Sequence, residues 1–185
     1  MTLGIQYRVR QFKHAVSAKP TSEDLDEIQG ILTPEQMALF RQMQASEQAH
    51  SLRVFKQLHK LGKAGLVTNH PDLFVAALLH DIGKIHHPLR LYERVMVVLG
   101  KALFPDRSKI WGNVSIGSLS HLGGWKRPFI VAEQHPKWGA EMAEEAGTSP
   151  LAVTLIRHHQ DHSSSDHDTL EETLLRDLQV VDGNN

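Results

Sequence analysis

The sequence predicts an all-α fold, a helical bundle with a metal site in its core, and three observations lead to this prediction. Helix start and stop signals recur along most of the chain. The most apolar segment, LFVAALLHDIGK at 73–84, is rich in strong helix formers. Several histidines and aspartates lie on apolar helix faces, where side chains from different helices converge. A chain of 185 residues without cysteine is expected to form one domain with no disulfide.

The first half of the chain is expected to contain three helices. A short helix over 24–29 ends at Gly30, and Thr33-Pro34-Glu35 supplies an N-cap, a proline at the first helical position and an acid in the first turn. This signal predicts a long helix over about 34–61. The third helix begins near Asn69 and contains the apolar run. A parallel β-strand is the alternative for that run, but the absence of a β-branched cluster favours a helix.

The second half is expected to contain four more helices around a loop-rich segment. Prolines and glycines are frequent over 105–134, which predicts mainly loop with short turns and makes this stretch a candidate lid. Glycine and Ser-Pro signals mark the boundaries of the elements on either side. The predicted helices cover 91–104, 135–146, about 150–160 and about 168–182.

Composition excludes several classes of protein. No stretch approaches the roughly 20 apolar residues of a membrane span, and the N-terminus lacks the apolar core of a signal peptide. The formal net charge of -1 excludes a strongly basic nucleic-acid binder. Because there is no cysteine, a metal must be held by imidazole and carboxylate. The same lack of cysteine fits a cytoplasmic location.

Charge is unevenly distributed along the chain. Residues 84–137 contain nine lysines and arginines against three acids, whereas residues 138–185 contain two arginines against ten acids. One interpretation is that both segments are ordinary solvated faces. The other is that the basic segment forms an anion-attracting wall beside an acidic, metal-binding layer of helices.

Histidine is unusually frequent, with thirteen in the chain, and it is the commonest metal ligand in proteins. Helical periodicity indicates which candidate ligands face the core. Three of them share an apolar stripe with residues one or two turns away and are expected to point inward. They are His50, in line with Val54 and Leu58; His158, in line with Leu151 and Leu155; and Asp182, in line with Leu175 and Leu178.

His80 and Asp81 lie at the end of the most apolar predicted helix. A charged aspartate left unpaired there costs several kcal/mol, and a bound cation removes that penalty. A single inward histidine is more often an ordinary core residue, and a single buried aspartate is often a cap or an ion-pair partner. Asp177 lies on a stripe that overlaps that of Asp182. The coincidence of several such residues therefore carries the metal-site prediction.

These residues resemble the HD superfamily of metal-dependent phosphohydrolases. The resemblance covers roughly residues 45–182 and follows the family's order: EQAHSLRVFKQL, LLHDIGK, HPKWGAEMAEEAG, RHHQ and LLRDLQVVD. It implies an HD-domain helical bundle, with residues 1–33 as an N-terminal helical extension and residues 85–134 as a basic insert. That insert is expected to set the choice of substrate.

The resemblance also implies a site, residue by residue. His50, His80, Asp81 and Asp182 match the four principal metal ligands, and Asp81 can bridge two ions. His135 and His158 match the extra histidines of binuclear members, so two divalent ions are expected, whether Mn, Fe, Ni, Co or Zn. The neighbouring His159 is expected to contact substrate or metal.

The predicted reaction is hydrolysis of a phosphate ester, either a monoester or a diester, of a nucleotide or another small phosphorylated metabolite. Metal-activated water is the expected nucleophile. Lys84 is expected to stabilise the charge that grows on phosphate, although a solvated lysine at a helix C-terminus is its ordinary interpretation. The basic residues Arg90, Arg94, Lys126 and Arg127 are further candidate contacts, and the spacing selects none of them.

Departures from the family pattern narrow the prediction. The motif HHExxDGxGYP of cyclic-di-GMP phosphodiesterases is absent, so that activity is not expected. Ser46 stands where trinuclear members carry an acid, which argues against a third ion. Two alternatives remain open. One is a mixed-valence di-iron oxygenase of the same fold, and the other is a non-catalytic HD module that binds a nucleotide.

Overall fold

The computed structural model describes residues 19–113, 124–161 and 169–184, and every regular element within these ranges is a helix. The all-α prediction is therefore confirmed, and so is the choice of helix for the apolar run. Residues 114–123 of the predicted lid lie outside the described residues. Most of the predicted N-terminal extension and the polar run at 163–166 lie outside them as well.

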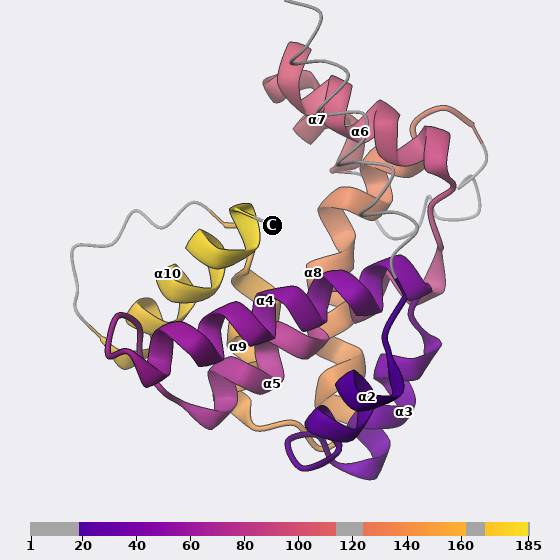
Figure 1. Ribbon diagram of the computed structural model, residues 1–185. Coiled ribbons are helices and arrows are strands. Elements are labelled where there is room, and N and C mark those ends of the chain that lie inside the picture. Colours follow the sequence, from indigo (N-terminus) through magenta and orange to yellow (C-terminus); the bar gives the residue numbers. More distant parts are fainter. Residues whose placement is uncertain (1–18, 114–123, 162–168, 185) are drawn as a thin grey trace, which may run out of the picture.

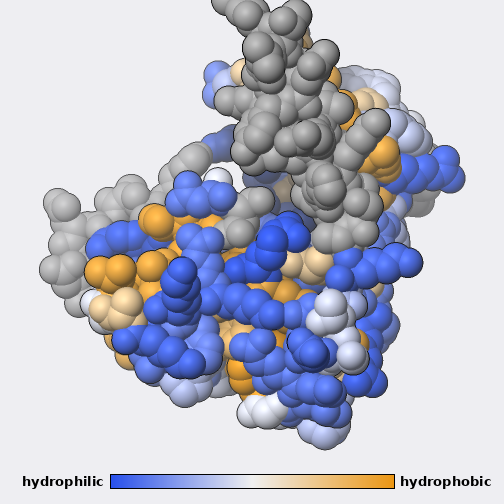
Figure 2. All heavy atoms as spheres, in the orientation of Figure 1, coloured by the Kyte–Doolittle hydropathy of each residue, from blue (hydrophilic) through white to orange (hydrophobic). Residues whose placement is uncertain are grey.

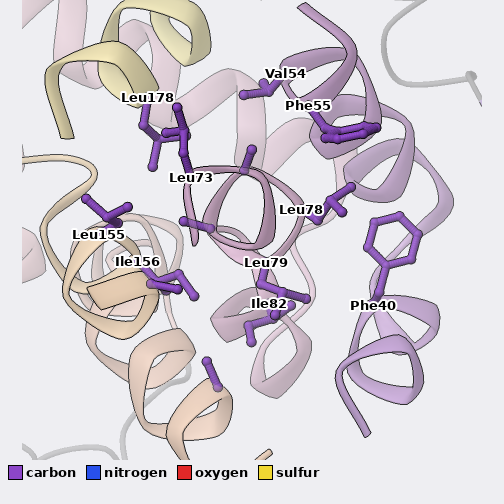
Figure 3. Close-up of a cluster of buried hydrophobic side chains, with 14 of the residues drawn as sticks. Phe40, Val54, Phe55, Leu73, Leu78, Leu79, Ile82, Leu155, Ile156 and Leu178 are labelled. Atoms are coloured by element: carbon purple, nitrogen blue, oxygen red, sulfur yellow. The ribbon is translucent and has the colours of Figure 1, made fainter. Parts of the chain in front are cut away.

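Helix α5 (Pro71–Leu79) is the centre of the bundle. Figure 1 shows it beside α4 (Ala45–Lys63) and α9 (Pro150–His158), with α10 (Leu170–Gly183) close by. In the core (Figure 3), Leu73, Leu78 and Leu79 of α5 lie among apolar side chains of the surrounding helices, and all three are fully buried. Burial on every side explains why the sequence of α5 shows no polar face.

The N-terminal part contains two short helices before α4. Helix α2 (Ser22–Gln29) ends at Gly30, as predicted, and α3 (Pro34–Gln42) begins at the N-cap Thr33. The single helix predicted over 34–61 is wrong, because the backbone at Met43 and Gln44 is extended. The Glu47 side chain accepts a hydrogen bond from the Gln44 backbone N–H at 3.2 Å and so begins a new helix. Glutamine is a weak N-cap signal, so the sequence pattern did not reveal this break between two helices.

The predicted loop over 105–134 is also wrong in its described part. It contains α7 (Pro105–Gly112) and the start of α8 (Arg127–Glu145), and α6 (Leu91–Leu103) precedes it as predicted. The prolines that suggested loop stand in the first turn of α7 and α8, where proline is tolerated. Helix α8 begins at Arg127, eight residues before the start predicted at 135, and Pro136 lies inside it. In Figure 1, α6 and α7 pack against the upper end of α8, above the rest of the bundle.

The surface is mixed in character. Hydrophilic residues cover most of the visible face of the bundle, with hydrophobic residues between them (Figure 2). Across the described parts of the chain, no helix is long and apolar enough to cross a membrane.

A close backbone contact joins the end of α5 to α8. The short 3-10 helix η1 (Ile82–His86) lies directly on α8, and a Cβ atom at Gly83 would come within 2.0 Å of the His135 carbonyl oxygen. The same atom would lie 2.6 Å from the Gly139 backbone nitrogen. Only glycine leaves room for this contact, which brings Asp81 next to His135.

We therefore expect Gly83→Ala to lower the free energy of unfolding by about 1–3 kcal/mol, because rigid backbone must move to admit the methyl group. Gly30→Ala is the matched control, since a Cβ atom there has nothing within 4 Å and the backbone φ is -84°. Urea unfolding followed by circular dichroism measures both. Equal stability of the two variants would contradict this account of the η1–α8 contact.

Candidate metal centre

Three buried histidines point unpaired nitrogen atoms at one another. The Nδ1–H groups of His80, His135 and His159 donate to backbone carbonyl oxygens of their own helical turns, at 2.9, 3.0 and 2.7 Å. Because a carbonyl oxygen only accepts, these bonds place a proton on each Nδ1, so each Nε2 is the atom that can offer a lone pair to a metal once it carries no proton itself. All three Nε2 atoms are buried without a hydrogen-bond partner. Orphaned buried nitrogens fixed in this tautomer are the arrangement that metal-binding histidines require.

The first group of candidate ligands comprises His50, His80 and Asp182, from α4, the end of α5 and α10. One ligand atom from each lies within 4.8 Å of the others. The Asp182 Oδ1 atom is 2.8 Å from His50 Nε2 and 3.5 Å from His80 Nε2. This set of two imidazoles and one carboxylate suits a divalent transition metal.

The second group comprises Asp81, His135 and His159, from the start of η1, α8 and the end of α9. The Asp81 Oδ1 atom is 3.3 Å from His135 Nε2 and 3.8 Å from His80 Nε2. The imidazole ring centroids of His80 and His159 are 5.1 Å apart. Asp81 and His80 are adjacent in the chain, so the two groups of candidate ligands are neighbours.

The charged groups of the site and burial together shift the pKa values of its histidines. Burial alone lowers the pKa of His80, but the carboxylates of Asp81 and Asp182 outweigh it and raise that pKa to about 9. Burial lowers the pKa of His159 well below its usual value, and His80 and His135 lower it further. His159 is therefore a neutral ligand at physiological pH, whereas a cation at His80 must displace a proton.

Lys84 lies at the edge of the site. Its Nζ atom is 2.7 Å from both carboxylate oxygens of Asp81. Although burial raises the pKa of Asp81, Lys84 and His80 lower it more strongly, so that the carboxylate stays ionised. The pair explains how a carboxylate with only 3% of its residue surface exposed exists in an apolar setting.

A second buried ion pair connects the insert to the site. The Arg94 guanidinium on α6 is 2.9 Å from Glu47 Oε1 and donates to Ser46 Oγ at 3.0 Å. Ser46 and Glu47 both precede His50 on α4, so this contact fixes α6 against the helix that carries a candidate ligand. The guanidinium also places a positive charge at Ser46, which disfavours a further cation there.

The structure brings together five of the six residues that the resemblance assigned to metal binding: His50, His80, Asp81, His135 and Asp182. It places His158 elsewhere. The His158 side chain is 43% exposed and its Nδ1 atom pairs with Asp161 Oδ2 at 2.6 Å. His159, expected to contact substrate or metal, joins the second group instead.

Helical register explains the difference between these two histidines. The buried stripe of α9 contains Ala152, Leu155 and Ile156, and the position that continues it is 159. The stripe used in the sequence prediction included Leu151, which is only partly buried. The prediction that His158 points inward is therefore wrong, because the buried position lies one residue further along the helix.

The choice between Asp182 and Asp177 is also decided by geometry. Asp177 Oδ2 accepts a hydrogen bond from the Thr68 backbone N–H at 2.9 Å and belongs to neither group of candidate ligands. It fixes the loop between α4 and α5. Asp182 is the acid of α10 that meets His50 and His80.

Histidines and aspartates gathered from six helical elements form a candidate metal site in the helical bundle. Comparison with family models makes the class specific: the HD domain family model matches residues 48–182. The chain belongs to the HD domain family, which indicates metal-dependent phosphohydrolase chemistry at the level of the superfamily. Comparisons with curated proteins and with solved structures found no match.

The two adjacent histidines provide a direct test of the ligand set. We expect His159→Ala to lose one of two bound manganese ions, because the second group keeps only Asp81 and His135. His158→Ala is the matched control and should retain both ions, because its side chain lies outside both groups. Elemental analysis of the manganese-loaded proteins after gel filtration measures the stoichiometry. Loss of metal from His158→Ala alone would contradict the assignment.

Proposed function

We propose that this protein is a divalent-metal-dependent hydrolase of phosphate esters. The observation that carries the proposal is the convergence of three buried histidine Nε2 atoms, each without a hydrogen-bond partner, with the carboxylates of Asp81 and Asp182. Family membership supports the same chemistry in general terms. Monoester or diester preference and the identity of the metal are part of the proposal to be tested.

The residues divide between two ions. His50, His80 and Asp182 would hold one ion, and Asp81, His135 and His159 the other. When bound, such ions supply Lewis acidity toward phosphate oxygens and lower the pKa of water to roughly 7. The contact between Arg94 and Ser46 favours two ions over three.

The remaining residues of the site bind and orient the substrate. Hydrolysis forms a new P–O bond to the oxygen of water and breaks the P–O bond to the leaving group, which ends protonated. We assign Lys84 the role of donating to a phosphate oxygen on which negative charge accumulates. Its ammonium group is next to Asp81 and partly exposed, so it can reach a substrate without leaving the site. Asp81 is then shared between Lys84 and metal.

The direct experiment combines metal analysis with a screen of phosphomonoesters and phosphodiesters in the presence of Mn, Fe, Ni, Co or Zn. We expect metal-stimulated phosphate release by the unaltered protein. In Asp81→Asn we expect kcat to fall about a thousandfold or more, because the variant lacks the negative charge of the Asp81 carboxylate, which lies next to both groups of candidate ligands. Thr68 contacts Asp177, so Asp177→Asn is a matched control that should keep kcat within about twofold.

Two other outcomes would overturn the proposal. Iron-dependent oxygen consumption with no phosphoester turnover would identify the site as that of an HD-fold oxygenase. Tight nucleotide binding with no turnover under any of these metals would identify a non-catalytic binding module.

A further inference from the structure

A cleft of about 600 Å³ opens directly onto the candidate metal centre. Two of the candidate ligands, His159 and Asp182, form part of its lining. The rest of the lining comes from the insert helices α6 and α7 on one side and from α8, α9 and α10 on the other. Its volume lies within the range of small-molecule sites, so a substrate held there can be larger than a single phosphate.

Four cationic side chains line this cleft, each from a different helix: Lys101, Lys109, Lys137 and Arg157. In the described part of the chain, the ion pairs of lysine and arginine involve other residues, namely Lys56, Lys84, Arg94 and Arg127. Within the described residues, none of the four cationic groups of the cleft therefore forms a salt bridge with a carboxylate. They are available to an anion.

Three acids also line the cleft, and two of them are occupied. Asp182 contacts His50 and His80, and Asp161 pairs with His158. Glu133 is the third, and it acts on Lys101, whose pKa it raises against the larger effect of burial. When Asp182 binds a metal, the four cationic side chains of the cleft outnumber its two other acids.

The cationic groups continue from the metal centre into the insert. Burial lowers the pKa of Lys101, and after Glu133 the next influences are Lys84 and Lys109, which lower that pKa further. Both lysines are thus within electrostatic reach of Lys101, and Lys84 itself lies on Asp81. Lys101 and Lys109 both line the cleft, so positive charge is concentrated there.

We propose that this cleft binds a second phosphate group, so that the preferred substrate carries at least one phosphate besides the one at the metal centre. Lys101 and Lys109, both from the insert, are the residues that determine this specificity. The inference rests on the proposed hydrolase function for its catalytic consequence. Nucleoside diphosphates and sugar bisphosphates share the required chemistry, and the cleft is wide enough for either.

The first test measures binding without catalysis. Calorimetry of the metal-free full-length protein in chelator compares inorganic pyrophosphate with inorganic phosphate. We expect pyrophosphate to bind about tenfold more tightly, because its second phosphate contacts the cationic side chains of the cleft. Lys101→Ala/Lys109→Ala should remove most of this preference. Lys60→Ala/Lys63→Ala is the control with the same change in charge, and both of its lysines lie at a different pocket on α4.

The second test measures turnover by the manganese-loaded protein. A nucleoside diphosphate is compared with the matching monophosphate. In Lys101→Ala/Lys109→Ala we expect the KM for the diphosphate to rise about tenfold, with kcat within about twofold and the KM for the monophosphate nearly unchanged. A uniform loss on both substrates, or an equal effect of the control variant, would overturn the inference.

The two arms separate this inference from the proposed function. Selective pyrophosphate binding that depends on Lys101 and Lys109, without hydrolysis of any ester, would support the cleft and overturn the hydrolase. Hydrolysis without a charge-dependent preference in either arm would support the hydrolase and overturn the cleft.

Discussion

The buried carboxylate of Asp81 is the constraint on which the rest of the structure depends. A carboxylate left uncompensated in an apolar core destabilises a protein by about 3–5 kcal/mol. Here Lys84 contacts both of its oxygens and His135 approaches one of them. The neighbouring His80 is drawn toward the same charge, and its raised pKa is the result. A site in which several imidazole nitrogens and carboxylate oxygens lie this close together is suited to divalent cations.

The fold delivers these groups through ordinary helix packing. Each candidate ligand sits near a helix end or on a buried stripe, and α5 holds the bundle together at its centre. The contact between Gly83 and the backbone of α8 sets the distance from Asp81 to His135. Arg94 ties the insert to α4 just before His50, so the helices that form one wall of the cleft are fixed relative to the metal centre.

Much of this was predictable from the sequence, and the exceptions have physical causes. Periodicity predicted the inward orientation of His50 and Asp182, and the apolar run marked His80 and Asp81. His135 followed only from the resemblance to the HD superfamily. Periodicity also chose His158 over His159 because both neighbours carry the same side chain, and a one-residue shift in register is invisible without the burial of Ala152 and Ile156. The break at Gln44 was missed because glutamine is a weak cap signal, and the helices within 105–134 were missed because first-turn prolines resemble loop signals. The cleft lysines needed tertiary structure, since they come from separate helices.

We propose that two metal ions bind side by side, one in each of the two neighbouring groups of candidate ligands. Crystals soaked in manganese, with anomalous diffraction recorded at the manganese absorption edge, test this most directly. The account predicts two anomalous peaks, one among His50, His80 and Asp182 and the other among Asp81, His135 and His159. An absence of peaks within coordinating reach of Asp81 and His80 would contradict it.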